Sequence, residues 1–189
     1  MKDKKRCEWP GADPLMIHYH DTEWGKPERN DGKIFRAILL DTFQAGLSWR
    51  IILHKRDNFA KAFDNFDYEK IARYSEAKKA KLLKDAGIIR NRLKINGTVE
   101  NAKAFIRVRK EFGTFSKYIW GFVDNKLIVN KHKVSSSIGS TSPLSDKIAL
   151  DMKSRGFKFC GSTVTYAFMQ GIGMVNDHLT TCFRYKEIK

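Results

Sequence analysis

The chain has 189 residues, and its 36 Lys and Arg outnumber 21 Asp and Glu to give a formal net charge of +15. Hydrophobic residues make up 42%, enough to fold one domain spanning 1–189 and to exclude disorder. No apolar run approaches the roughly 18 to 20 residues of a membrane span, and no signal segment follows the basic start. We therefore expect a soluble, cytoplasmic protein. The charge indicates a polyanionic partner such as DNA or RNA, although lysines that merely keep a surface soluble would give the same excess.

Start and stop signals predict helices from the beginning of the chain. Asp13 and Pro14 open the first helix, which runs through residue 20. Asp31 is the expected N-cap of the second, and Gly46 follows its end. Ser48 caps a third. The second helix has one apolar face, made by Ile34, Phe35, Ile38, Leu39, Thr42 and Phe43.

The middle and last parts of the chain continue the helical pattern. Asp67 and Ser75 are alternative helix starts, Gly87 ends the helix that follows, and a long basic helix is expected over about 90–112. Later helices are predicted from Ser142 to Gly156, from residue 162 or 163, and in a last turn or two over 176–182. Only 126–129 alternates like a strand, and 133–142 forms a Ser-rich loop. The fold class predicted is all-α.

Positive charge is concentrated in residues 78–110, which contain eleven basic residues and only two acidic ones. This segment spans two predicted helices joined by Gly87, Ile88 and Ile89. Glycine can take a positive φ there, and the backbone N–H groups that open the second helix, next to Arg90, would then bind a phosphate. The arrangement is similar to the helix-hairpin-helix element of DNA repair proteins. The alternative is an ordinary solvated helical face.

Potential metal ligands lie at both ends of the chain. Cys7 and His20 are near the start, and His178 and Cys182 are four residues apart near the end, a spacing that places two side chains on one helical face. Two thiolates and two imidazoles suit a tetrahedral structural zinc. His18 could replace His20, and the four residues could also be unrelated. Cys160 lies in an apolar run and is interpreted as a buried thiol.

Eight short motifs are spread over nearly the whole chain. They are Arg6-Cys7-Glu8-Trp9, Asp13-Pro14-Leu15, Tyr19-His20-Asp21, Glu23-Trp24-Gly25, Gln44-Ala45-Gly46-Leu47-Ser48-Trp49, Asp85-Ala86-Gly87-Ile88-Ile89-Arg90, Arg155-Gly156-Phe157-Lys158-Phe159 and Val175-Asn176-Asp177-His178. Together they resemble the 3-methyladenine DNA glycosylase I family. The resemblance implies an all-α helix-hairpin-helix fold and a structural Zn²⁺ that clasps the terminal segments. It assigns the ligands Cys7, His20, His178 and Cys182 and so selects His20 over His18.

The same resemblance implies a base pocket and a wedge. Gly46 and Leu47 correspond to the wedge that enters the duplex where the damaged nucleotide leaves, and Gly87, Ile88 and Arg90 would contact DNA. Asp41 stands where many members carry Glu, which puts lesion affinity and range in question; Met16 stands where some carry Tyr. The pocket residues implied are Trp9, Tyr19, Trp24, Asp41 and Trp49.

These residue types suit excision of a damaged base. A glycosylase must flip the nucleotide out of the stack, and aromatic faces hold a cationic methylated adenine better than neutral adenine. A carboxylate such as Asp41 adds charge-assisted hydrogen bonds. No Asp occurs between Gly87 and Asp124, so no dedicated general base is expected. The implied activity is monofunctional excision of 3-methyladenine from alkylated double-stranded DNA by a monomer.

Two other interpretations remain open from the sequence. Trp9 and Trp24 could be ordinary core residues and Asp41 a solvated helical carboxylate, which would leave a non-catalytic, zinc-stabilised DNA-binding module. The shorter side chain of Asp41 could also give a glycosylase with a shifted choice of lesion.

Overall fold

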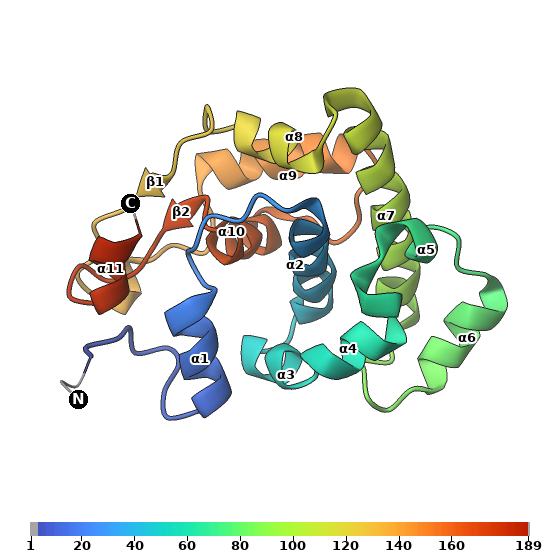
Figure 1. Ribbon diagram of the computed structural model, residues 1–189, viewed down its shortest axis with the longest axis horizontal. Helices are drawn as coiled ribbons and strands as arrows, with labels where there is room; N and C mark the ends of the chain where they lie inside the picture. Colours follow the sequence, from blue (N-terminus) through green and yellow to red (C-terminus); the bar gives the residue numbers. More distant parts are fainter. Residues whose placement is uncertain (1–3, 189) are drawn as a thin grey trace.

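A computed structural model describes residues 4–188 of the protein. Residues 1–3, which belong to the basic start considered above, and residue 189 lie outside it. The described part is mostly helical, as predicted, and its one sheet has two strands of two residues each (Figure 1). Within the same residues no helix is both long enough and apolar enough to cross a membrane.

The elements follow the predicted order closely. The longest is α7, which begins at Arg92 rather than at residue 90 and ends at Phe112. The others are α1 (Pro14–Thr22), α2 (Asp31–Gln44), α3 (Trp49–His54), α4 (Arg56–Ala62), η1 (Asp64–Phe66), α5 (Tyr68–Ile71), α6 (Glu76–Lys84), α8 (Phe115–Gly121), β1 (Ile128–Val129), η2 (Ser135–Ser137), α9 (Pro143–Ser154), α10 (Ser162–Gly171), β2 (Val175–Asn176) and α11 (Phe183–Glu187).

The main core surrounds α2, which lies in the middle of the molecule between α7 and α10 (Figure 1). Phe35 and Phe43, on the predicted apolar face of this helix, are fully buried, and so are Phe59 and Phe63. A second, smaller cluster gathers around the two chain ends and includes Cys7, Met16, Tyr19, Trp24, Leu53, Leu179 and Cys182. Trp49 packs against both clusters, so the space between them is bordered by aromatic side chains.

The helix starts show one difference from the sequence prediction. Asn30, not Asp31, caps α2, with its side chain accepting from the backbone N–H of Lys33. The carboxylate of Asp31 instead accepts from the backbone N–H groups of Phe115 and Ser116, the first residues of α8. Asp31 therefore satisfies the free N–H groups of a different helix, a contact between distant segments that local patterns do not reveal.

The predicted last turn of helix over 176–182 is wrong. Residues 175–176 form β2, which pairs in parallel with β1, and α11 begins only at Phe183. The side-chain oxygen of Asn176 accepts from the backbone N–H of His178, and the N–H of Thr180 donates to the carbonyl of His132. These bonds replace the helical ladder, as local side-chain acceptors commonly do.

Gly87 also differs from its predicted conformation. Six described glycines have a positive φ, and Gly87 is not among them. Its lack of a side chain serves a close approach instead, because a Cβ would lie 2.9 Å from the Asp85 Oδ1 and 3.2 Å from the Asn58 Cβ. The N–H of Gly87 donates to that same Asp85 oxygen over 2.7 Å. The turn between α6 and α7 is thus fixed by packing and a side-chain hydrogen bond.

Candidate active site

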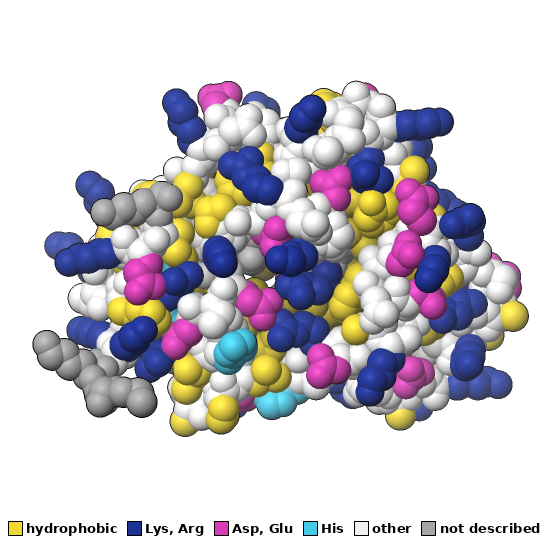
Figure 2. All heavy atoms as spheres, viewed as in Figure 1, with side chains coloured by type: hydrophobic (Ala, Val, Ile, Leu, Met, Phe, Trp, Pro, Cys, Tyr) yellow, Lys and Arg dark blue, Asp and Glu magenta, His cyan; other side chains and the backbone are white. Residues whose placement is uncertain are grey.

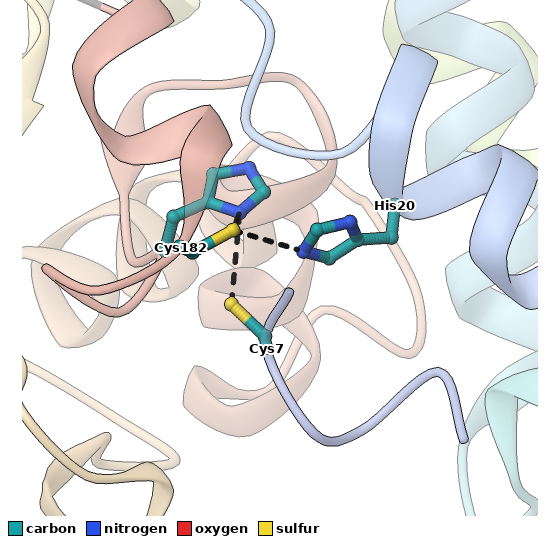
Figure 3. A group of neighbouring side chains, drawn as sticks. Cys7, His20 and Cys182 are labelled. Atoms are coloured by element: carbon teal, nitrogen blue, oxygen red, sulfur yellow. Dashed lines mark hydrogen bonds between the residues drawn. The ribbon is translucent and has the colours of Figure 1, made fainter. Parts of the chain in front are cut away.

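The four proposed metal ligands converge from both ends of the chain. Their ligand atoms lie within 4.8 Å of one another, and all four residues are buried. Figure 3 shows the side chains of Cys7, His20 and Cys182 pointing toward one another. Cys182 Sγ is 3.5 Å from His20 Nε2 and 3.6 Å from His178 Nδ1, and Cys7 Sγ is 3.7 Å from His178 Nδ1. In a tetrahedron with ordinary Zn–S and Zn–N bond lengths, sulfur and nitrogen are about 3.6 Å apart. The set therefore fits a tetrahedral metal ion.

Hydrogen bonds on the far side of each ring orient both histidines. His20 Nδ1 lies 2.7 Å from a carboxylate oxygen of Asp21, which Arg6 holds with two guanidinium nitrogens. His178 Nε2 lies 3.1 Å from the carbonyl of Trp24. Each contact takes the N–H of one ring nitrogen and leaves the other, Nε2 of His20 and Nδ1 of His178, as a lone-pair donor for a metal. His18, the alternative ligand, is exposed.

The surroundings of the Cys182 thiol favour the thiolate, which is the form that binds a metal. The neighbouring Cys7 thiol, and after it the imidazoles of His178 and His20, hold the pKa of the Cys182 thiol far below its usual value. Cys160 is half-buried against the main core and lies apart from this cluster. The four ligands thus join the N-terminal arm to the segment after β2, although His178 and Cys182 sit on a turn-rich loop rather than on one helix.

A cavity of about 340 Å³ adjoins the metal cluster, and all five predicted pocket residues line it. Trp9, Tyr19 and Trp24 come from the N-terminal segment, Asp41 from α2 and Trp49 from the first turn of α3. The other lining residues, which the sequence motifs do not assign to a pocket, are Gln44, Ser135, Ile138, Ala167 and Gln170. Gln44 belongs to a quoted motif, but the remaining four lie in segments without a local signal.

Two pairs of aromatic rings form the walls of the cavity, one packed edge to face and the other tilted. The ring centroids of Trp9 and Trp24 are 5.1 Å apart at 69°, and those of Tyr19 and Trp49 are 5.1 Å apart at 45°. Trp24 also contacts the ring of His178 at 4.6 Å, so the metal cluster supports one wall. The indole nitrogens of Trp9 and Trp49 are buried and have no partner within the described chain. A buried donor without a partner costs free energy, which a ligand acceptor would recover.

Asp41 supplies the acidic group of the cavity. Its side chain is only 6% exposed, and no residue of the described chain donates a hydrogen bond to its carboxylate. Burial raises the pKa of Asp41 to about 8, because a charged carboxylate is poorly solvated there. The alternative of a solvated helical carboxylate is wrong. Met16, the other departure from the family pattern, is buried in the smaller core cluster.

Tyr19, Asp41 and Trp49 also line a second cavity of about 440 Å³. Its other walls carry charged side chains, among them Glu23, which pairs with both Arg36 and Arg56. A flat aromatic ligand has fewer apolar faces to stack on in that chamber. The aromatic cavity is therefore the better candidate for a base.

The predicted wedge follows α2. Gly46 has φ +78°, a conformation that favours glycine, and Leu47 is 37% exposed. Lys94, a buried residue of α7, donates from Nζ to the carbonyls of Phe43 and Ala45 over 2.8 and 2.6 Å. The turn is thus tied to the first turn of the basic helix.

The basic segment presents less free charge than its sequence indicates. Lys94 is buried, and four other cations of 78–110 pair with carboxylates, namely Lys78, Lys79, Lys103 and Arg109. Arg90 is exposed, whereas the side chain of Ile88 is buried in the core and only its backbone could face DNA. Lys and Arg side chains are spread across the whole face seen in Figure 2, not confined to α6 and α7.

Comparison with known proteins decides the family. A family model described as methyladenine glycosylase matches residues 9–185. The chain belongs to the methyladenine glycosylase family. DNA-3-methyladenine glycosylase 1 of Escherichia coli (strain K12) is 42% identical over 181 residues, which cover 96% of this chain and 97% of that protein. DNA-3-methyladenine glycosylase of Haemophilus influenzae is 42% identical over 177 residues, or 94% of this chain and 96% of that one.

Solved structures of family members have the same fold. A crystal structure of 3-methyladenine DNA glycosylase I is similar with a TM-score of 0.92 at 43% identity, and the match covers 95% of this chain and 98% of that one. A tyrosine-to-phenylalanine variant of 3-methyladenine DNA glycosylase I, in complex with 3-methyladenine, gives a TM-score of 0.92 at 28% identity over 94% and 96% of the two chains. The family expected from the sequence motifs is confirmed.

Proposed function

We propose that the protein is a DNA glycosylase that excises 3-methyladenine from alkylated double-stranded DNA and leaves an abasic site. The observation that carries this proposal is the aromatic cavity, in which one buried carboxylate, Asp41, faces four aromatic side chains. A flat cationic base fits those walls, and an unpaired buried carboxylate is stabilised by the positive ring. Membership of the methyladenine glycosylase family supports the same substrate.

The chemistry follows from the charge of the lesion. Methylation makes the ring cationic, so cleavage of the N-glycosidic bond returns the bonding electrons to the ring and releases a neutral base. Water then adds to the sugar carbon and loses a proton. The cation gains from the faces of Trp49 and Tyr19, about 0.5 to 2 kcal/mol for each contact, and from the Asp41 carboxylate. Binding of an unstable lesion therefore supplies most of the rate, with no dedicated general base.

The surface around the cavity supports a role in holding the duplex. Leu47 is the residue we expect to fill the space left by the flipped nucleotide, and the N–H groups of the turn at Gly87 together with Arg90 are expected to bind a phosphate. The turn between α6 and α7 would then act as the helix-hairpin-helix element. We also propose that the protein acts as a monomer in the cytoplasm.

The residues at the chain ends fit a zinc ion better than a harder metal, because two thiolates and two imidazoles are soft ligands. With Cys7, His20, His178 and Cys182 all engaged, no position remains for water, so the ion would be structural. Its effect on the reaction is indirect. Trp9 lies two residues from Cys7, and Trp24 packs on His178, so the metal holds two walls of the cavity in place.

The proposal is tested by incubating methylated duplex DNA with the protein and separating the released bases by chromatography. Release of 3-methyladenine is expected, with the phosphodiester backbone intact until the abasic sites are cleaved chemically. A non-catalytic DNA-binding module would release nothing above a control without protein. Release of a different methylated base would instead identify a shifted lesion choice caused by the shorter Asp41 side chain.

A further inference from the structure

Besides Asp41, the cavity wall includes the polar side chain of Gln170. This residue lies in the last turn of α10, one turn after Ala167, and both line the cavity. Its side-chain nitrogen Nε2 donates to the Asp177 Oδ2 over 2.7 Å. A carboxylate only accepts hydrogen bonds, so the atom of Gln170 facing Asp177 must be the nitrogen. The orientation of the amide is therefore determined.

Asp177 is held firmly enough to impose that orientation. It is fully buried and also accepts from the hydroxyl of Tyr166 over 2.7 Å and from the side-chain amide of Asn130 over 2.6 Å. His132 Nε2 lies 3.3 Å from the same carboxylate. These groups come from α10 and from the loop after β1, so the carboxylate is anchored from two sides and Gln170 cannot rotate without losing a charge-assisted bond.

The side-chain oxygen of Gln170 is left unused. No donor within the described chain hydrogen-bonds to it, and the residue borders the cavity. Resting on the function proposed above, we propose that Gln170 is a specificity-determining residue whose oxygen accepts a hydrogen bond from the exocyclic amine of the flipped base. Asp177 is then a positioning residue, which acts through the amide of Gln170 without touching the base.

This arrangement explains how the cavity would select adenine lesions over guanine lesions. The exocyclic amine of adenine carries two hydrogens, and two residues with acceptor oxygens line the cavity, Asp41 from α2 and Gln170 from α10. Guanine has a carbonyl oxygen at the corresponding ring position. That oxygen would face the Gln170 oxygen and the Asp41 carboxylate, which the positive ring of the lesion keeps ionised, so it would find no donor. Sites built around a hydrogen bond reject ligands that cannot complete it.

The test is the ratio of 3-methyladenine to 3-methylguanine released from the same methylated duplex. In Asp177→Asn the new amide can either donate or accept, so Gln170 can turn its nitrogen toward the cavity. We expect the ratio of kcat/KM values to fall at least tenfold. Gln170→Leu removes the acceptor without creating a donor. Its kcat/KM for 3-methyladenine should fall about tenfold, while that for 3-methylguanine should not decrease.

Tyr166→Phe is the matched control, because it removes a different hydrogen bond from Asp177 and leaves the Gln170 bond in place; its ratio should stay near that of the wild type. An unchanged ratio in Gln170→Leu overturns the inference, even if Asp177→Asn fails to fold. A loss of both activities by the same factor would also overturn it, since that is the result of a purely structural role. If the wild type releases no base at all, the proposed function itself fails, which is a distinguishable result.

Discussion

Replacement of Asp41 by asparagine should stabilise the protein and weaken base binding at the same time. Burial raises the pKa of Asp41 from an ordinary value near 3.8 to about 8. Between these values the folded protein keeps a proton that the unfolded chain releases, so the stability of the wild type falls as pH rises through this interval. Each pH unit in this interval lowers the free energy of unfolding of the wild type by about 1.4 kcal/mol. Asparagine does not ionise and lacks this penalty.

Urea unfolding of both proteins at pH 5 and pH 7 measures the effect. The stability of Asp41→Asn relative to the wild type should increase by roughly 2 to 3 kcal/mol over these two units. Asp146→Asn, at an exposed carboxylate of α9, should show no such trend. In parallel, calorimetric titration with free 3-methyladenine should give a Kd at least tenfold weaker for Asp41→Asn, about 1.4 kcal/mol. If the difference in free energy of unfolding between the two proteins is the same at pH 5 and pH 7, or if the Kd is unchanged, the assignment of a buried, base-binding carboxyl is refuted.

Three further changes test the surrounding structure. Lys94→Met removes two hydrogen bonds to the end of α2 and should lower the free energy of unfolding by about 2 kcal/mol. Excision from duplex DNA should decrease more than free-base binding. A variant as stable as the wild type would contradict this role of Lys94. Elemental analysis should find one zinc per chain in the wild type and none in Cys182→Ala, which should melt at a lower temperature; a metal-free, fully folded wild type would refute the clasp. Gly173→Ala places a Cβ 2.3 Å from the backbone of residue 26 at φ +69° and should reduce soluble, folded protein sharply, whereas Gly161→Ala, with open space around it, should not.

Helix starts were the part of the fold that the sequence predicted best. Asp13, Ser48, Asp67, Ser75 and Ser142 all cap helices as expected, because an N-cap depends on residues within one turn. The predictions that failed depend on distant contacts. The carboxylate of Asp31 accepts hydrogen bonds from the start of α8. The conformation around His178 is set by pairing with β1 and by the metal cluster, not by the helical spacing of its residues.

The candidate site also has some features that the sequence predicts and others that depend on contacts between distant segments. The motifs led to Trp9, Tyr19, Trp24, Asp41 and Trp49 through the family resemblance, and the structure brings all five to one cavity. Composition alone would not have separated them from core residues. Gln170 and Asp177 could not be connected from the sequence, because their bond depends on where α10 ends relative to the loop after β2. The buried state of Lys94 was equally invisible, since in the sequence it is one of the eleven basic residues of 78–110.

The central claim is that excision of 3-methyladenine takes place in the aromatic cavity. The most direct measurement compares release of 3-methyladenine from methylated duplex DNA by the wild type and by Ala167→Phe, a substitution that fills the cavity from α10. Affinity for undamaged duplex, measured alongside, should be the same for both proteins. We predict release by the wild type and a loss of at least a hundredfold in the variant. Equal release by the two proteins would contradict the account.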